Sequence, residues 1–354
     1  MTNTKPNIAV IFGGVSSEYE VSCLSAANVL SIIDKDKYNV YVLGITPKGK
    51  WFLTQADVEQ IRNNKWLDAE NRVAFISPDR SVHGICVPGG ENIKIDVAFP
   101  VMHGKNGEDG SVAALLSLAG IKQVTTTMTS GANSMDKVIT KIICDKAGIT
   151  QADFEFFYDR DIKNNLNSVV EKIESRFDYP VFVKPSSAGS SVGVSKCYNK
   201  TQLKAGLVLA AKHDFKVLVE ENIIGAEVEC AVIGNSVPEC ATCGQIAPSA
   251  DFYSYDSKYN DENSLLFIPA KISDNAIKCV CEMAKRVYLA MECQGFSRVD
   301  FFVTDDEKII FNEINTIPGF TDISMFPKLM AHSGLKGTAL IDRLIELALS
   351  EDRI

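Results

Sequence analysis

Polar side chains interrupt two neighbouring apolar strands between residues 295 and 321, and this pattern constrains the fold more than any other. Arg298 and Asp300 lie two positions apart on the first predicted strand, so their side chains point the same way. Glu313 and Asn315 repeat this spacing on the second strand, after a polar turn at residues 305–308. If the turn holds an even number of residues, all four side chains share one face of a hairpin. The opposite face then carries Val299, Phe301, Ile310 and Ile314.

Two carboxylates and an amide oxygen on one face are hard oxygen ligands, which suit Mg²⁺ carrying a nucleoside triphosphate. The alternative is a solvated hairpin face with one surface ion pair. We favour a metal site because the polar residues interrupt strands that otherwise look buried.

Composition limits the class of protein. At 354 residues the chain should hold two or three domains, and its 46% hydrophobic and 23% charged content is that of an ordinary globular protein. A net charge of −9 argues against general binding to nucleic acids or membrane surfaces. We expect no signal peptide before the strand at Ile8, and the apolar run from Ser111 to Ile121 is too short to cross a bilayer. A cytoplasmic location is therefore expected.

The ten cysteines are scattered singly along the chain. Cys240 and Cys243 have CxxC spacing, but no second pair or histidine follows at the distance typical of a zinc site. Cys279 and Cys281 are two apart on a predicted helix and so face different directions. We expect neither pair to bind a metal or to carry redox chemistry.

Strands and helices alternate through the first 125 residues. Apolar strands are expected at 8–12, 40–45 and 97–102, and helices at 21–33 and 111–119. This βαβ order predicts a parallel sheet with helices on its faces, and ligands on such sheets bind beyond the carboxyl ends of the strands. The loops that carry Glu18, Glu20 and residues 103–109 lie at that end. Gly13-Gly14 lacks the full GxGxxG spacing, so we reject a dinucleotide cofactor.

The regular alternation of strands and helices ends near residue 125, and the order of elements beyond it differs. This change predicts three domains. We place an N-terminal α/β substrate domain at 1–124, a central α+β lid domain at 125–212 and a C-terminal α+β catalytic domain at 213–354. Helices are expected at 135–146, 168–176, 275–292 and 338–349, and further strands at 180–184 and 192–198.

Three segments carry candidate nucleotide ligands. Lys184 ends an apolar strand, and the glycine- and serine-rich loop 185–193 that follows offers backbone amides and hydroxyls with little steric bulk, which suits a lid over phosphates. Lys137 is a second candidate cation. Glu220 ends another apolar strand and, with Glu227, could bond the amino group of adenine and the ribose hydroxyls. The alternatives are a surface hairpin, an ordinary helix lysine and solvated loop acids.

Taken in order, these segments resemble the D-alanine:D-alanine ligase family of ATP-grasp enzymes, including its D-alanine:D-serine ligase branch. The similarity runs over nearly the whole chain and is dense in IFGGVSSEYEVS, FPVMHGKNGEDGS, MDKVITK, YPVFVKPSSAGSSVGVSK, VLVEENIIGAEVE, FYSYDSKYN and SRVDFF…NEINTIPGFT. The resemblance implies an α/β ATP-grasp fold in which the N-terminal βαβ domain and the two α+β domains enclose ATP. Ala226, where arginine is frequent, and residues 125–130, where a more apolar junction is usual, depart from the family pattern.

The resemblance also implies roles for individual residues. Contacts with the nucleotide are implied for Lys137, Lys184, Ser191, Glu220, Glu221, Ile223, Glu227 and Lys258. Two Mg²⁺ ions, replaceable by Mn²⁺, would be bound by Asp300, Glu313 and Asn315. Around the first D-alanine and the reacting carbonyl, the implied residues are Glu20 (which would pair with the ammonium group), His103, Ser190, Tyr259, Arg298 and the amide of Gly319. Ser324 and Met325 would line the pocket for the second substrate.

The implied reaction is the ATP-dependent ligation of two D-alanines through D-alanyl phosphate, which gives D-alanyl-D-alanine for peptidoglycan synthesis. Three alternatives stay open: D-serine as the acceptor, as in the ligases of vancomycin resistance; a non-catalytic nucleotide-binding regulator on the same fold; and another ATP-grasp carboxylate–amine ligase. Glu20, His103 and Tyr259 favour the D-alanine family, and the retained metal and lysine residues favour an enzyme. The family is commonly dimeric, so we expect a homodimer, with no nucleic-acid or membrane partner.

Overall fold

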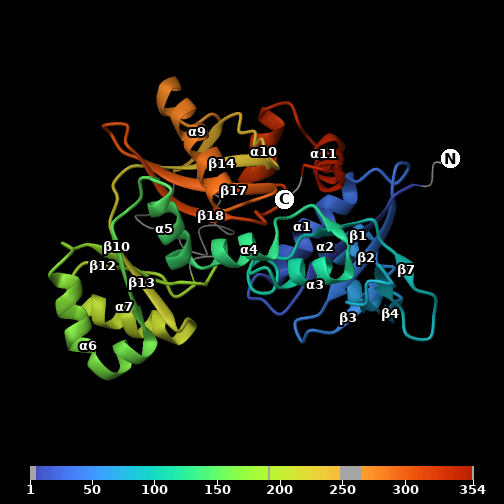
Figure 1. Cartoon of the computed structure of the whole chain (residues 1–354), viewed down its shortest axis with the longest axis horizontal. Helices are drawn as coiled ribbons and strands as arrows, with labels where there is room; N and C mark the ends of the chain where they lie inside the picture. Colours follow the sequence, from blue (N-terminus) through green and yellow to red (C-terminus); the bar gives the residue numbers. More distant parts are fainter. Residues whose placement is uncertain (1–4, 190–191, 248–264, 353–354) are drawn as a thin grey trace.

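The chain folds into three structural units, each built on a β-sheet. The computed structural model describes residues 5–189, 192–247 and 265–352. Figure 1 shows the N-terminal unit at the right, the central unit at the lower left and the third unit above it. The described strands form four sheets, because a small three-stranded sheet accompanies the N-terminal one.

The N-terminal unit is a six-stranded sheet in the order β4-β3-β2-β1-β8-β9. Its strands are β1 (Asn7–Gly13), β2 (Asn39–Ile45), β3 (Trp51–Thr54), β4 (Asn71–Val73), β8 (Val97–Pro100) and β9 (Lys122–Gln123). β1 runs parallel to β2 and β8, and β8 runs parallel to β9, which confirms the predicted parallel sheet. The antiparallel strands β3 and β4 extend one edge and were not predicted. β1 is buried almost throughout, as its continuous apolar run requires of a central strand.

Helices and a small sheet complete this unit. They are α1 (Tyr19–Ile32), α2 (Val58–Arg62), the short 3₁₀ helix η1 (Trp66–Asp68), α3 (Ser111–Ala119), β5 (Phe75–Ile76), β6 (Gly84–Cys86) and β7 (Ile93–Lys94). The helices predicted at 21–33 and 111–119 are confirmed by α1 and α3.

The central unit is an antiparallel sheet in the order β10-β13-β11-β12, packed against two helices. Its elements are β10 (Phe154–Tyr158), α6 (Asp159–Glu174), β11 (Val181–Pro185), β12 (Ser195–Cys197), α7 (Lys200–His213) and β13 (Lys216–Glu221). β13 pairs with both β10 and β11, so the predicted boundary after residue 212 is wrong. It separates one strand from the sheet to which that strand is hydrogen-bonded.

The third unit is an antiparallel sheet in the order β16-β15-β14-β17-β18. Its elements are α4 (Met128–Met135), α5 (Lys137–Lys146), β14 (Ala226–Gly234), β15 (Cys243–Ala247), β16 (Leu265–Phe267), α9 (Asp274–Ala290), β17 (Gly295–Val303), β18 (Ile309–Asn315), α10 (Met325–His332) and α11 (Thr338–Leu349). α4 packs on β18 and α5 on α9, so residues 128–146 belong with this sheet and not with the central domain as predicted. None of the helices in the described ranges is long and apolar enough to span a membrane.

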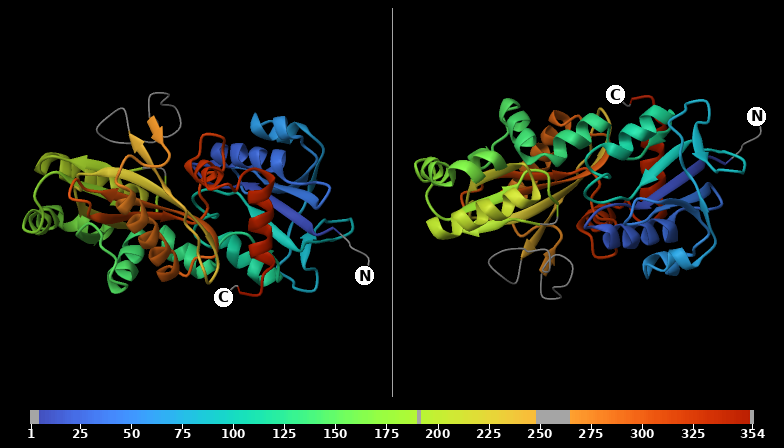
Figure 2. Two further views of the ribbon diagram at one scale, coloured as in Figure 1. Left: turned by 90° about the horizontal axis from the view of Figure 1, so that it is seen from above. Right: turned by 90° about the horizontal axis from the view of Figure 1, so that it is seen from below.

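The last helix ties the third unit to the first. α11 packs against α1, β8 and β9 as well as β17, and Figure 2 shows it in red beside the blue N-terminal elements in both views. Ile8 and Val10 of β1 share one buried apolar cluster with Leu340 and Ile345 of α11. The two ends of the chain therefore contribute to the same core.

The β17–β18 hairpin brings the four predicted polar residues to one face through a β-bulge. Val303 pairs with Ile309, so the loop between them holds five residues, an odd number. The pairing shifts between Asp300 and Phe301, and Asn312 is the extra residue on β18. Beyond the bulge, Asp300 pairs with Glu313 and Arg298 pairs with Asn315.

The bulge also corrects one predicted core residue. Ile310 pairs with Phe302, which lines the cavity described below, whereas Phe311 packs in the apolar core with Phe301. The prediction that Ile310 shares the core face is therefore wrong, because the extra residue reverses the alternation of side chains along β18.

Candidate active site

A cavity of about 510 Å³ lies where the three units meet. Its charged lining comes from loops, helices and strands of all three units and includes Glu18, His103, Glu108, Lys137, Lys141, Lys184, Lys196, Glu220, Glu221, Glu227, Arg298 and Glu313. Enclosed cavities with converging polar groups are the usual form of small-molecule sites in proteins.

Arg298 organises the carboxylates on the hairpin face. Its Nε and a terminal nitrogen donate to the two carboxylate oxygens of Asp300 at 2.8 and 2.7 Å, and Nε also lies 3.1 Å from Oε2 of Glu229. The amide nitrogen of Asn315 donates to Asp300 at 3.3 Å, and Asn315 also lines the cavity, so its amide oxygen remains available as an acceptor. Burial alone would lower the pKa of Arg298, but the charges of Asp300 and Glu229 raise it well above its ordinary value. Arg298 is therefore a fixed positive charge.

Glu220, on β13 of the central sheet, forms ion pairs with two lysines. Its carboxylate pairs with Lys184 through one oxygen and with Lys141 through the other at 3.0 Å. Burial alone would raise the pKa of Glu220, but Lys141 and Lys184 lower it from 4.5 to about 2. Lys141 was not predicted as a site residue, although it follows Lys137 by four residues on α5, a spacing that places both side chains on one helix face.

Lys137 stands in the first turn of α5, between the hairpin and the loop after β11. Its Nζ donates to the carbonyl oxygen of Ala188 at 2.9 Å and lies 3.6 Å from Oε2 of Glu313. Asp136 caps the same helix, accepting from the amides of Val138 and Ile139, and it also accepts from the hydroxyl of Ser186. This cap fixes the helix end to the start of the glycine- and serine-rich loop.

Of the two acids beside the start of α1, Glu18 and not Glu20 lines the cavity. Glu18 precedes α1, is 7% exposed and lines the cavity, whereas Glu20 is exposed on the helix surface. Two residues along a helix turn the side chain by about 200°, so only one of the two acids can face the cavity. A Cβ on Gly104 would lie only 2.3 Å from Oε2 of Glu18, which explains the glycine at that point.

His103 lies beside Glu18 at the same end of the cavity. Its Nε2 lies 2.8 Å from the Ser25 hydroxyl, and its Nδ1 lies 3.0 Å from the carbonyl oxygen of Ile317 and 3.7 Å from Oε1 of Glu108. Burial alone would lower the pKa of His103, but Glu108 and then Glu18 raise it above its ordinary value. The carboxylates of Glu108 and Glu18 therefore favour the protonated, positively charged form of the His103 imidazole.

The chain matches two sequence profiles of one family, which are described as D-ala D-ala ligase N-terminus over residues 7–126 and D-ala D-ala ligase C-terminus over residues 143–346. The chain belongs to the D-alanine–D-alanine ligase family. It is therefore a ligase, and enzymes of this family depend on ATP and a divalent metal ion.

Individual relatives are similar to this chain over nearly its full length. The D-alanine–D-alanine ligase of Acetivibrio thermocellus is 44% identical, and the match covers 97% of this chain and 96% of the relative. The VanG D-Ala:D-Ser ligase of Enterococcus faecalis superimposes with a TM-score of 0.90 at 40% identity, covering 98% of this chain and 100% of that one. The D-alanine–D-alanine ligase of Coxiella burnetii gives a TM-score of 0.85 at 31% identity, covering 98% and 96%.

Apart from Glu20, the predicted site residues of this ligase fall into three groups. The cavity lining includes Lys137, Lys184, Glu220, Glu221, Ile223, Glu227, His103, Arg298, Glu313, Asn315 and Gly319, and Asp300 is hydrogen-bonded to Arg298 and Asn315 of this lining. Ser324 immediately precedes α10 and lies close to Gly319, and Met325 is buried in the apolar core against Gly244. Ser190, Ser191, Lys258 and Tyr259 lie outside the described residues.

Proposed function

We propose that this ligase joins two D-alanine molecules into D-alanyl-D-alanine through a D-alanyl phosphate intermediate, and so supplies a building block of peptidoglycan. The observation that carries this proposal is the convergence, in one cavity, of the Arg298–Asp300–Glu313 face, the lysines around Glu220 and the Glu18–His103 pair. The same substrates support a cytoplasmic location, because ATP is supplied there.

The residue types match the chemistry. A carboxylate is a poor electrophile, so the γ-phosphoryl group is first moved onto the carboxylate of the first D-alanine. That transfer needs positioning and charge neutralisation more than a covalent nucleophile, and Lys137 and Lys184 supply fixed positive charges for the phosphates. The amine of the second amino acid then attacks the acyl phosphate, and Arg298 with the amide of Gly319 stabilises the negative oxygen that develops. Exclusion of water from the cavity during the reaction would protect the acyl phosphate from hydrolysis.

Oxygen donors fit the divalent metal that the family requires. Asp300, Glu313 and the amide oxygen of Asn315 would hold two Mg²⁺ ions, or Mn²⁺ in their place, and the ions would neutralise phosphate charge and orient the triphosphate. Glu18 replaces Glu20 as the residue proposed to pair with the ammonium group of the first D-alanine, because only Glu18 faces the cavity. Glu220, Glu221, Ile223 and Glu227 are proposed to surround the adenosine.

The division of labour among the domains is also a proposal. The N-terminal unit would bind the first substrate, the central unit from residue 147 to Glu221 would act as the lid over the phosphates, and the third unit would carry the metal face. A homodimer is the proposed assembly, by analogy with the family.

The metal assignment predicts a charge-specific loss. Glu313→Gln keeps the shape of the side chain but removes a formal charge, so it should weaken Mg²⁺ binding, and activity should recover partly at high Mg²⁺. Asp300→Asn should behave in the same way with less recovery, because Asp300 also holds Arg298 through two hydrogen bonds. The rate of ADP release is measured across a Mg²⁺ titration, with Asp306→Asn in the exposed hairpin turn as the matched control. Unchanged activity of Glu313→Gln at low Mg²⁺ would show that the hairpin is not the metal site.

The alternative acceptor is D-serine, a possibility that the likeness to the VanG ligase supports. The family resemblance implies that Met325 lines the pocket for the second substrate and so favours D-alanine; in the structure its thioether is 4% exposed and packs in the apolar core. A methyl group against such a wall gains about 0.8 kcal/mol, whereas an unpaired serine hydroxyl costs about 1–3 kcal/mol. Apolar pockets reject hydroxylated isosteres only modestly, so some D-alanyl-D-serine should form.

The expected result is D-alanyl-D-alanine as the main product when D-alanine, D-serine and D-lactate are offered at equal concentration as acceptors. Mass spectrometry of the products gives the ratio directly. Predominant D-alanyl-D-serine would move the enzyme to the D-serine branch, and an absence of ADP release dependent on D-amino acids would favour a non-catalytic regulator.

A further inference from the structure

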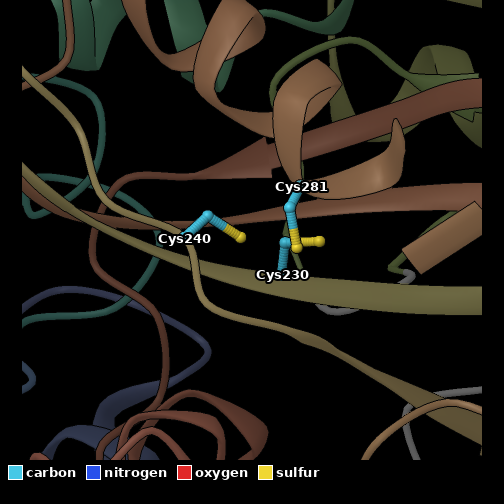
Figure 3. A group of neighbouring side chains, drawn as sticks. All are labelled: Cys230, Cys240 and Cys281. Atoms are coloured by element: carbon cyan, nitrogen blue, oxygen red, sulfur yellow. The ribbon is translucent and has the colours of Figure 1, made fainter. Parts of the chain in front are cut away.

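Three cysteines from separate parts of the sequence converge on the side of the third sheet that faces away from the active site. Cys230 lies on β14, Cys240 lies in the connection between β14 and β15, and Cys281 lies on α9. Their Sγ atoms all lie within 4.8 Å of one another. Figure 3 shows the three side chains side by side, Cys281 from the helix, Cys230 from the strand and Cys240 from the loop, with the sulfur of Cys240 directed toward the other two.

The fold separates this cluster from the catalytic face. Along β14, Glu227 and Glu229 point toward the cavity side, where Glu229 contacts Arg298. Cys230 is the next residue, so its side chain points to the opposite face of the sheet, which α9 covers. The cluster is therefore not a part of the oxygen-ligand site around Asp300.

The three cysteines lie among apolar side chains. The apolar core on this side of the sheet includes Cys230 together with Val280 and Ala284 of α9, Cys240 packs against that core, and Cys281 is 5% exposed. Cys240 is partly exposed, whereas Cys230 and Cys281 are buried. None of the three forms a disulfide in the structure.

The geometry matches the requirements of a thiophilic cation. Thiolate sulfurs bind Zn²⁺ at about 2.3 Å, which places the sulfurs of a tetrahedral site about 3.8 Å apart. Three sulfurs already within 4.8 Å need only small side-chain rotations to reach that spacing. Soft sulfur ligands select d¹⁰ cations such as Zn²⁺ over the Mg²⁺ that suits the carboxylates of the active site. Lys285 follows Cys281 by one helical turn and adds positive charge beside the thiolates.

We propose that Cys230, Cys240 and Cys281 form a second metal site, with three cysteine ligands from the protein, that binds one Zn²⁺-like cation and takes a water molecule or an external thiol as the fourth ligand. Binding would join strand, loop and helix on the back of β14, the strand that carries Glu227 and Glu229 toward the nucleotide side. The sequence alone indicated no metal site, since its two closely spaced cysteine pairs each contribute a single member to the cluster.

Cd²⁺ titration of the reduced, full-length protein tests the site. The ultraviolet charge-transfer band of Cd²⁺ arises from thiolate ligands, so any Cd²⁺ at the carboxylates of Asp300 and Glu313 does not contribute to it. The expected result is a band that saturates at one Cd²⁺ per chain and is removed by competing Zn²⁺ but not by Mg²⁺. Cys240→Ser, at a partly exposed loop position, should lower the band and weaken binding about 10-fold or more, as should Cys281→Ala.

The matched control is Cys279→Ser, because Cys279 is exposed on the same helix two residues from Cys281. Its titration should equal that of the wild type. A wild-type protein without a saturable band overturns the proposal, and so does a band that survives in both Cys240→Ser and Cys281→Ala. An equal loss in Cys279→Ser would likewise overturn the assignment of ligands. The ligase assay plays no part in these readouts, so their failure leaves the proposed function intact.

Discussion

Arg298→Lys should lower kcat by about 10²- to 10³-fold while the protein stays folded. Loss of one positioned donor to a developing oxyanion has an effect of this size. Lysine keeps the positive charge between Asp300 and Glu229 but loses the planar fork that bonds both oxygens of Asp300. Arg298→Ala should also destabilise the fold by about 3–5 kcal/mol, because it leaves two buried carboxylates without their partner.

The two variants separate catalysis from folding. ADP release at saturating substrates gives kcat, and urea unfolding gives the free energy of unfolding. Arg343→Lys is the matched control, because Arg343 also pairs with a glutamate, Glu239, but on the surface. A folded Arg298→Lys enzyme with the kcat of the wild type would remove Arg298 from the chemical step.

Lys184→Met should depress turnover by about 10²-fold or more, because it removes a fixed cation from the proposed phosphate site. The sequence alone indicates little effect on folding for a lysine at the end of a strand. The structure changes that expectation, since Lys184 is one of the two cations that hold the pKa of Glu220 down at about 2.

The effect on stability has a definite pH dependence. Because the pKa of Glu220 is lower in the folded chain than its ordinary value of 4.5, this carboxylate stabilises the fold above that value. The contribution is lost as the pH falls from about 4.5 toward 2. In Lys184→Met this loss should be smaller, because only Lys141 remains beside the carboxylate. Unfolding between pH 3 and pH 7, compared with the exposed Lys212→Met, measures the difference, and a full-strength acid dependence in Lys184→Met would contradict the pairing.

Local patterns in the sequence predicted many of the elements of this chain. The alternation around Arg298 and Asp300 identified a strand of the hairpin whose polar face lies at the cavity, and the apolar run at Ile8 identified a central strand, because both signals depend only on neighbouring residues. The face of a strand to which each side chain points was harder to predict. The sequence did not reveal the bulge at Asn312, so the correct face of the hairpin was predicted from a turn of the wrong parity.

The remaining errors concern features that depend on contacts between residues far apart in the sequence or on the exact bounds of an element. Glu18 and Glu20 are both acids beside the first helix, and only the point at which α1 begins decides which one faces the cavity. β13 joins the central sheet through hydrogen bonds to strands far away in the sequence, which no local composition reveals. The cysteine cluster is similar, because residues 230, 240 and 281 meet only after α9 packs on β14.

The apolar cluster shared by β1 and α11 has a consequence for synthesis on the ribosome. Chains leave the ribosome from the amino end, and domains at that end usually fold first. Here the side of β1 that carries Ile8 and Val10 is completed by Leu340, Ile341 and Ile345 of α11, which are made long after β1. Part of the apolar surface of the N-terminal sheet therefore stays uncovered on the ribosome until α11 has been made and can pack against it.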